Sequence, residues 1–561
     1  MHLPDRFIPA VGIVLLVTSF ASVVISQQCG TGDNTARNNI VYPMYMNSRP
    51  QDSRSCSLTV KDGRLEVAAP VSNPAMSCPD MFAWKLYADV IQQEFWKNWA
   101  ADPQTWPASP LPMCANGAAG AACCLPGGQS NPGYNNKTNP AQNCPYFPGD
   151  HLADFGGFMI QRGFLPSKAH ELGLAKVASQ RAPMLAVEPG RKIRQSMAEI
   201  VFRNKTMFRF VFENDLYNQE GIMAVFNANA QNLQSGAPYR ATNGVGPGHL
   251  TEIDFPPDAI MIKSNWLSRE RAEQLGLRDD PSAPYIKMTI TSPVTDNNGS
   301  ILQPGEHWLV ALHISSKDIP QWHWLTFEHV NNPGRCDYTG CNDSYGFSSA
   351  DMVKVGQAKN FTTPHVVCDK LDLPAWVFDT AKPYPSGPIN PELQQVLSAL
   401  GIGTKPEVPP VNRKDGPTYI PHTSDEAWLS YRLKGAQNSF VDNVGHATHL
   451  ANSVTEGGFV SSSSCVTCHS RAGSTSKGTL PPALGVFLNQ VGDEGYFESA
   501  RGIPDEYWFF KSRTPLQLDV LQTDFVWGFL SANPLKSAAA LAAPQGTQPI
   551  PAGVRGRTGT E

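Results

Sequence analysis

The sequence contains no methionine after Met352, although it continues to residue 561. Charged residues are also scarce, because Asp, Glu, Lys and Arg make up 17% of the chain where about a quarter is usual. The net charge of −5 gives no reason to expect nucleic acid as a partner. The sequence has no repeat of fixed period, no phosphate-binding glycine fingerprint, and no Ser-His-Asp order or metalloprotease motif. Nucleotide-binding and hydrolytic functions therefore find no support in the sequence.

Long hydrophobic runs are absent except at the N-terminus. Arg6 is followed by an apolar stretch from Phe7 to Ile25, and a small-residue cleavage site at Ser26 would leave Gln27 first. This pattern predicts a signal peptide over residues 1–26. The alternative is an uncleaved membrane anchor, because the run is nearly long enough to span a bilayer. If the signal is cleaved, we expect no membrane span in the mature chain.

A Cys-x-x-Cys-His motif is the most informative feature of the chain. In Cys465–His469 the two thiols are spaced to add across the vinyl groups of one haem, and His469 follows directly as the proximal iron ligand. The alternatives are an ordinary disulfide between Cys465 and Cys468 or half of a zinc site. A zinc site would need a second ligand pair, and the sequence has no second Cys-x-x-Cys. We therefore expect one covalent haem c as the cofactor.

The remaining cysteines predict disulfides. Twelve cysteines less the two of the motif leave ten, an even number, which in an exported chain suggests up to five bridges of unknown pairing. Four of them lie between residues 114 and 144, in a Pro-, Gly- and Asn-rich loop over residues 102–150 that we expect disulfides to hold. The ten are Cys29, Cys56, Cys78, Cys114, Cys123, Cys124, Cys144, Cys336, Cys341 and Cys368.

The sixth iron ligand is left open by the missing downstream methionine. His446 and His449 lie about twenty residues before the motif and would share a face if that stretch is helical, and His422 is a further candidate. A methionine from far upstream, such as Met352, is the second possibility. The third is an open position, which would allow small molecules to bind at the iron. The alternative for His446 and His449 is that both are polar residues facing solvent and do not bind the iron.

Hydrophobic periodicity predicts an α+β protein. We expect an antiparallel β-rich body with packed helices, plus a small, mainly helical C-terminal c-type haem domain. Asp62-Gly63 favours a hairpin between strands at 58–60 and 65–67. Aromatic residues at helical spacing predict a helix over 79–99 that buries them as core, and the alternative is that they form a wall of the haem pocket. Other helices are expected at 196–218, stopped by Gly221, and at 514–530. Strands are expected at 251–255, 259–267, 285–291, 307–315 and 322–330.

The strand at 322–330 separates its polar residues between two faces. His323 and His329 share a face but lie about 20 Å apart along a regular strand, so they are not expected to bind one iron. Glu328 and His329 point to opposite faces and therefore do not form an acid–base pair. Isolated histidines such as His151 and His313, with His249 and His307, are expected to be structural.

Composition also suggests how the chain is divided. After the signal we expect a Cys- and Pro-rich region with one helix at 27–150, an α+β body at 151–415 and the haem domain at 416–531. The Pro-, Lys- and Gly-rich stretch at 401–421 favours the second boundary. Residues 532–561 are rich in Ala, Pro, Gly and Thr and predict a disordered tail.

Several passages resemble one group of proteins. They include 82–99, 200–217, 308–313, 322–332 and 450–469, and they resemble large exported bacterial proteins of the cytochrome c family that carry a single C-terminal haem motif. The resemblance covers most of residues 79–531 and implies haem at Cys465 and Cys468, iron at His469, and export. It implies little about the reaction, and the Cys-rich insert at 114–144 departs from the pattern.

These features together predict a periplasmic or secreted mono-haem protein that transfers electrons to or from an unknown substrate or partner protein. Two alternatives stay open. One is a peroxidase-like haem oxidoreductase with an open sixth position, and the other is a binding or sensor protein in which the haem is structural. No catalytic residue beyond the haem site is identified by the sequence.

Overall fold

The computed structural model describes residues 52, 55–115, 117, 120–151, 189–242, 250–291, 293–296, 300–333, 343, 345–349, 386–413, 416–441, 448, 450–457, 463–477, 503–504, 508–514 and 516–536. The proposed signal peptide at 1–26 and most of the proposed tail lie outside these ranges. None of the helices in the described ranges is long and apolar enough to cross a membrane.

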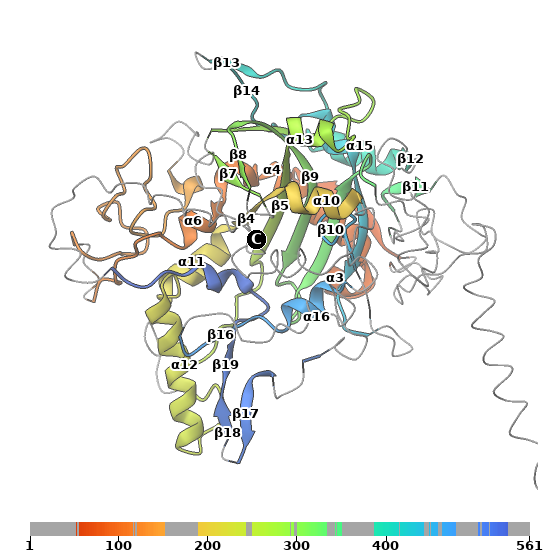
Figure 1. The fold of residues 1–561 in the computed structure, drawn as a ribbon. Helices are drawn as coiled ribbons and strands as arrows, with labels where there is room; N and C mark the ends of the chain where they lie inside the picture. Colours follow the sequence, from red (N-terminus) through yellow and green to blue (C-terminus); the bar gives the residue numbers. More distant parts are fainter. Residues whose placement is uncertain are drawn as a thin grey trace, which may run out of the picture.

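A seven-stranded antiparallel sheet forms the centre of the described structure, as Figure 1 shows. Its order is β15-β10-β9-β5-β4-β3, and β6 pairs with β9 as well. The strands are β3 (Ala100–Ala101), β4 (Ala198–Arg203), β5 (Ile260–Ser268), β6 (Lys287–Ile290), β9 (Gly305–Ser316), β10 (His323–His329) and β15 (Tyr431–Gln437). Four of the five predicted strands are thus confirmed, and with the helices around the sheet they establish the α+β class.

The fifth predicted strand, at 251–255, is not formed. Its backbone is held by side chains instead of by a neighbouring strand. The Asn229 amide donates to the carbonyl of Thr251 at 2.7 Å, and the N–H of Phe255 donates to Asp524 at 2.8 Å. Although its residues favour a strand, this segment is held by hydrogen bonds to side chains and does not pair with a strand of the sheet.

The smaller pairs lie outside this sheet. Asp62 and Gly63 both take positive φ, 50° and 72°, which confirms the predicted hairpin of β1 and β2. The remaining strands are β1 (Ser57–Lys61), β2 (Arg64–Ala68), β7 (Val294–Thr295), β8 (Ile301–Leu302), β11 (Phe347–Ser349), β12 (Ser386–Ile389), β13 (Val411–Arg413), β14 (Gly416–Thr418), β16 (Gly473–Thr475), β17 (Phe510–Arg513), β18 (Leu516–Leu518) and β19 (Val520–Gln522).

Helix α4 (Pro79–Gln92) confirms the predicted aromatic helix and covers the apolar face of the sheet. Its Trp84 and Tyr87 rings lie 4.9 and 4.4 Å from the Phe327 ring of β10, centroid to centroid. The aromatic stripe is therefore core packing, as expected. The predicted helix is interrupted at Glu94, whose φ of 45° ends one helix before α5 (Phe95–Asn98) begins.

The prediction of a helix at 196–218 is wrong in its first half. Ile200 and Val201 belong to β4, because β-branched residues there pair with β5. The helix α11 (Lys205–Glu213) begins only after Asn204, whose side chain accepts from the N–H of Met207 at 3.0 Å.

Gly221 does not stop a helix. It lies in the first turn of α12 (Gln219–Gln234), where a Cβ atom would stand 1.7 Å from the carbonyl oxygen of Asp215. The other helices are α3 (Pro74–Ser77), α6 (Asp102–Thr105), α10 (Pro189–Ser196), α13 (Arg269–Gln274), α15 (Pro391–Ala399), α16 (Cys465–His469), and the 3-10 turns η1 (Pro148–Asp150), η5 (Glu426–Ser430) and η9 (Trp527–Ser531).

Within residues 416–531, the described residues contain more strand than helix, and most of the others form turns and irregular segments. β15 belongs to the central sheet, so a separate, mainly helical haem domain is not seen in those described residues. The predicted closing helix at 514–530 is wrong. Leu516 and Leu518 alternate with period 2 in β18, which pairs with β17. β19 pairs with β16, the short strand that follows the Cys-x-x-Cys-His helix. These short strands lie near α12, below the sheet in Figure 1.

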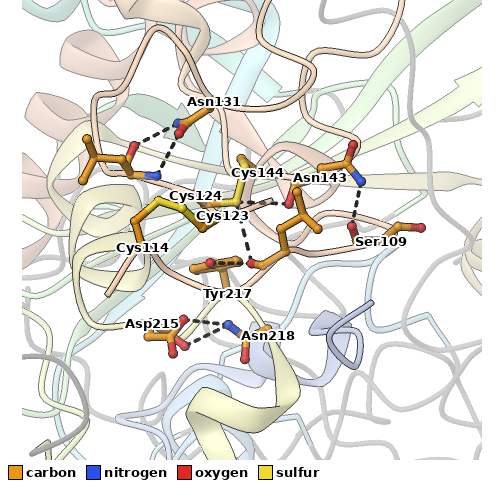
Figure 2. The surroundings of a disulfide bond; sticks show 12 residues. Ser109, Cys114, Cys123, Cys124, Asn131, Asn143, Cys144, Asp215, Tyr217 and Asn218 are labelled. Atoms are coloured by element: carbon orange, nitrogen blue, oxygen red, sulfur yellow. Dashed lines mark hydrogen bonds between the residues drawn. A yellow bond between two sulfur atoms is a disulfide. The ribbon is translucent and has the colours of Figure 1, made fainter. Parts of the chain in front are cut away.

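The cysteine-rich loop is held by two disulfides, as predicted. Cys114 bonds to Cys123 and Cys124 bonds to Cys144, and Figure 2 shows the two bridges side by side. The loop docks on the segment before α12, since the Tyr217 hydroxyl donates to the carbonyl of Leu111 at 2.7 Å. A third bridge joins Cys56 and Cys78, and the cysteines at 29, 336, 341 and 368 lie outside the described residues.

Candidate haem attachment site

The Cys-x-x-Cys-His motif forms the short helix α16, and the sequence before it sets where that helix starts. Ser464 is the N-cap, with its hydroxyl accepting from the N–H of Thr467. Gln437, at the end of β15, donates to the Ser464 hydroxyl at 3.0 Å and accepts from the N–H of Val466 at 3.0 Å. Because Gln437 and Val466 are both buried, this contact fixes the motif to the central sheet.

The two cysteines of the motif differ from every other described cysteine. Cys465 and Cys468 are not disulfide-bonded, whereas the six others in the described ranges form three bridges. Both are half-buried. Two reduced thiols at this spacing are the donor set that covalent haem attachment uses, and the finding does not favour the alternative of a structural disulfide.

His469 is held at both its ring face and its edge. Nδ1 lies 2.8 Å from the carbonyl oxygen of Phe525, and since a carbonyl only accepts, Nδ1 carries the proton. Nε2 then presents its lone pair, which is the arrangement expected of a metal-ligating imidazole. The Trp324 ring of β10 lies 4.2 Å from the imidazole, centroid to centroid.

The face of the sheet opposite α4, called the polar face below, carries buried polar side chains that contact residues 452–455. The Thr326 hydroxyl accepts from the Asn452 amide at 3.0 Å, and the Asn265 side chain accepts from the Thr455 hydroxyl at 3.1 Å. All four side chains are buried. The segment that carries the motif is thus fixed to the sheet by buried hydrogen bonds, together with the buried Val454, which belongs to a hydrophobic cluster with Trp308 and Val310 of β9.

A cluster of titratable groups lies beside Cys465 on this polar face. Nε2 of His313 lies 3.6 Å from Glu456, and Lys263 pairs with Glu199 at 3.3 Å. Burial raises the pKa of Glu456 to about 7, although Lys263 opposes this shift. Burial, together with the nearby charge of Lys263, lowers the pKa of His313 well below its usual value. Glu456 can therefore change its protonation near neutral pH, whereas His313 is held neutral.

The thiol of Cys465 responds to the same cluster. Burial and the carboxylate of Glu456 raise its pKa well above the usual thiol value, and Lys263 only partly offsets this. For Lys263, burial alone would lower the pKa, but Glu199 and Glu456 outweigh burial and leave it raised. The Cys465 thiol is therefore neutral at ordinary pH in the protein without a bound group.

A second buried charge cluster lies at the far end of the polar face. Glu328 accepts from Arg432 at 2.9 Å and from the Ser453 hydroxyl at 2.6 Å, and Lys434 lies 3.4 Å away. Burial would raise the pKa of Glu328, but Lys434 and Arg432 outweigh it and lower the pKa. A carboxylate with two cations is a structural ion cluster.

The strand histidines are structural, as predicted. His323 packs on Phe82, and His329 stacks on Tyr285 at 3.5 Å between ring centroids, both on the apolar face. Burial lowers the pKa of His323 to about 4 and of His329 to about 3. Glu328 lies on the other face, so the Glu328–His329 neighbours do not form an acid–base pair.

Of the predicted sixth ligands, only His422 lies within the described residues. Its Nδ1 lies 2.8 Å from the Ser424 hydroxyl, and its carbonyl accepts from the Trp428 indole on the α4 side of the sheet. His422 therefore lies on the wrong side of the sheet for the motif. His446, His449 and Met352 fall outside the described residues. Within the described ranges, no group of three or more His, Cys, Asp or Glu residues is arranged to hold a metal ion.

Sequence reasoning missed the residues that surround the motif. Trp324, His313 and Glu456 lie beside it, yet they are far from it along the chain or carry no local signal. The alternation at 322–330 placed Trp324 and Glu328 on one face and was the available clue. What the pattern could not reveal is that the segment carrying the motif returns to cover that face.

Comparisons with known proteins add nothing to this description. No family model, no curated protein and no solved structure matches the chain.

Proposed function

We propose that this protein is an exported mono-haem c-type cytochrome that transfers electrons to or from a substrate or partner. Cys465 and Cys468 would hold the haem through thioether bonds, and His469 would ligate the iron. When bound, the haem supplies one-electron oxidation and reduction. The protein itself provides attachment, orientation of the ligand and the electrostatic surroundings that set the potential.

The observation that carries the proposal is the hydrogen bond from His469 Nδ1 to the Phe525 carbonyl. This contact places the ring proton on Nδ1 and leaves the Nε2 lone pair as the one that would ligate iron. It occurs directly after two cysteines that are not disulfide-bonded, in a chain whose other described cysteines are. The donor set therefore fits a covalently attached haem.

Covalent haem attachment requires that the chain be exported. Haem c is attached outside the cytoplasmic membrane, and disulfides persist in the same oxidising environment. The three disulfides of the described residues support a periplasmic or secreted location. We infer a redox partner protein or a small-molecule substrate, and the polar face beside Cys465 supports a site where electron transfer is coupled to nearby protonation.

Variants of the motif test the proposal. The protein is produced with haem-attachment machinery, and the C465S/C468S double variant is compared with C56S/C78S, which removes a distant disulfide. We expect the first variant to lose the reversible haem redox signal and the second to keep it. A wild-type protein whose oxidation state does not change in a redox titration would refute electron transfer.

A second candidate function is favoured by the groups beside Cys465. Glu456, with a pKa of about 7, is placed for acid–base work next to the motif, and the neutral His313 lies 3.6 Å from it. They would suit a peroxidase-like enzyme that reacts with a small substrate at an open iron position. Carbon monoxide distinguishes the two functions, because a reduced protein whose spectrum does not change on addition has no open position.

A further inference from the structure

The carbonyl that binds His469 lies in a strained turn. Phe525 and the preceding Asp524 both have positive φ, 65° and 46°, which residues other than glycine rarely adopt. Trp322, which contacts this turn, has a φ of 62° as well. Three of the eight positive-φ residues other than glycine in the described chain thus meet at one place. Strain of this kind persists only where the surroundings enforce it.

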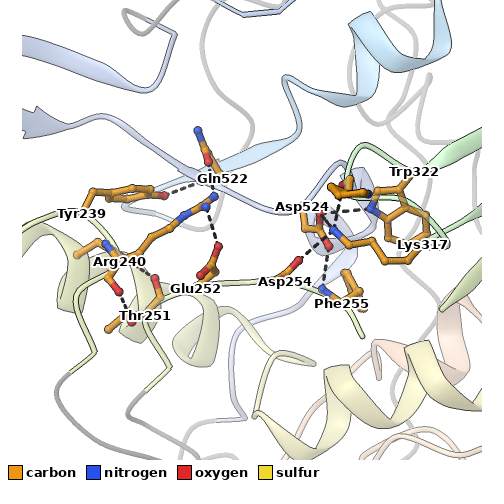
Figure 3. A network of polar contacts seen from close by, with 12 residues as sticks. Tyr239, Arg240, Thr251, Glu252, Asp254, Phe255, Lys317, Trp322, Gln522 and Asp524 are labelled. Atoms are coloured by element: carbon orange, nitrogen blue, oxygen red, sulfur yellow. Dashed lines mark hydrogen bonds and ion pairs between the residues drawn. The ribbon is translucent and has the colours of Figure 1, made fainter. Parts of the chain in front are cut away.

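Asp524 is the centre of the contacts that enforce the turn, as Figure 3 shows. One carboxylate oxygen accepts from the Lys317 ammonium at 2.6 Å and from the Trp322 indole at 3.2 Å. The other accepts from the N–H of Phe255 at 2.8 Å. The Asp524 and Lys317 side chains are only 7% and 9% exposed, so this pair is poorly screened by solvent.

The loop between β9 and β10 lies next to both groups that contact His469, the Trp324 ring and the carbonyl of Phe525. Lys317 and Trp322 lie between β9 and β10, and Trp324, whose ring contacts the imidazole, follows directly and donates to the carbonyl of Gln321 at 2.9 Å. Two contacts therefore connect this part of the chain to His469. One is the Trp324 ring at the start of β10, and the other runs from Lys317 and Trp322 through Asp524 to the carbonyl of Phe525. A change at Asp524 therefore alters the geometry of the ligand.

We propose that Asp524, anchored by Lys317 and Trp322, is a positioning residue that sets the hydrogen bond to His469 and thereby tunes the iron potential. This inference rests on the proposed haem function. A strong hydrogen bond from Nδ1 makes the imidazole a better donor to iron and stabilises the oxidised state. Loosening the turn weakens the bond, so the reduction potential rises.

The test compares three variants with a matched control. D524N, K317M and W322F each remove one member of the anchor. D254N is the control, because Asp254 also contacts Lys317, at 3.0 Å, but its side chain is 62% exposed and is not a partner of Asp524 in the hydrogen bonds given above. Reduction potential and the exchange rate of the His469 Nδ1 proton, followed by NMR of ¹⁵N-histidine-labelled holoprotein, are measured for all four.

We expect all three anchor variants to raise the potential and to speed Nδ1 proton exchange by roughly tenfold, the scale of one lost hydrogen bond. D254N stays at the wild-type values. K317M is decisive, because loss of a positive charge alone would lower the potential, whereas loosening the turn raises it. W322F changes no charge and carries the test if D524N does not fold.

A fall in potential for K317M, or unchanged proton exchange in all three variants, overturns the positioning role and leaves only a charge effect. A wild-type chain without covalent haem overturns the proposed function instead, and it is recognised by mass before any variant is compared.

Discussion

The indole ring of Trp324 lies 4.2 Å from the imidazole of His469, which joins the central strand β10 to the last residue of the haem motif. The two residues are 145 positions apart, so only the fold brings them together. Trp324 is 2% exposed and packs from the polar face of the sheet. The motif therefore packs directly on the central sheet, and the position of His469 depends on β10.

The first prediction concerns Trp324. We expect W324A to lower the free energy of unfolding by about 3–5 kcal/mol, as for other buried aromatic residues, and also to alter the haem absorption spectrum, because His469 loses the ring that restrains it. Denaturant unfolding and absorption spectra measure the two effects. W308A is the control, since Trp308 is equally buried but stacks on Tyr285. It should cost similar stability and leave the spectrum unchanged, and equal spectra for both variants would contradict the account.

Gln437 gives a second prediction. Replacement by Ala leaves the buried Ser464 hydroxyl and Val466 N–H without this partner, so we expect a loss of about 2–3 kcal/mol in denaturant unfolding. Q231A, at an exposed position in α12, should change stability by less than about 0.5 kcal/mol. If both variants unfold at the same denaturant concentration, Gln437 does not fix the motif to the sheet.

The third prediction concerns the buried ion cluster around Glu328 on the polar face. E328Q leaves Arg432 and Lys434 without their shared carboxylate, and removing one partner of a buried pair costs about 3–5 kcal/mol. E213Q breaks the exposed pair with Arg209 and should cost less than about 1 kcal/mol. Thermal and denaturant unfolding compare the two variants. Near-equal losses would mean that the Glu328 cluster is not a structural support of the polar face.

His329 determines part of the acid sensitivity. Its Nδ1 accepts from the N–H of Asn331 at 3.1 Å, and Nε2 donates to the carbonyl of Pro284 at 3.1 Å, so the fold requires the neutral ring. With a folded pKa of about 3 and an ordinary value near 6.5, the unfolded chain binds one more proton between these values. Stability from this residue is therefore complete above pH 6.5 and declines as the pH falls toward 3.

The measurement is the stability difference between wild type and H329Q as a function of pH. We expect it to shrink on acidification by at most about 1.4 kcal/mol per pH unit below 6.5, and to stay constant above that pH. A difference that is the same at pH 4 and pH 7 would show that the His329 ring is not held neutral.

The sequence predicted the elements that depend on local rules. Asp62-Gly63 requires a tight hairpin, the aromatic spacing from Trp84 requires a buried helix, and the alternation around Glu328 requires a half-polar strand. Each was found. The errors arose where tertiary pairing overrides local pattern, as at Ile200, where an apolar run suits a helix and a strand equally.

The site itself was only half predictable. The motif proposes Cys465, Cys468 and His469 as the haem site, because the residues that attachment would need are five consecutive positions. Nothing local marks Asp524 or Glu456, whose surroundings include Lys317 and Lys263, about 190 to 210 positions away along the chain. Sequence can specify a covalent attachment point, but the surroundings that set its potential exist only in the folded chain.

The central claim is that one haem is bonded to Cys465 and Cys468, and the mass of the denatured, matured protein tests it most directly. The account predicts a chain heavier than its sequence by one haem, with the added mass located on the peptide that contains both cysteines. A matured chain with no added mass, or with a disulfide between these cysteines, would contradict it.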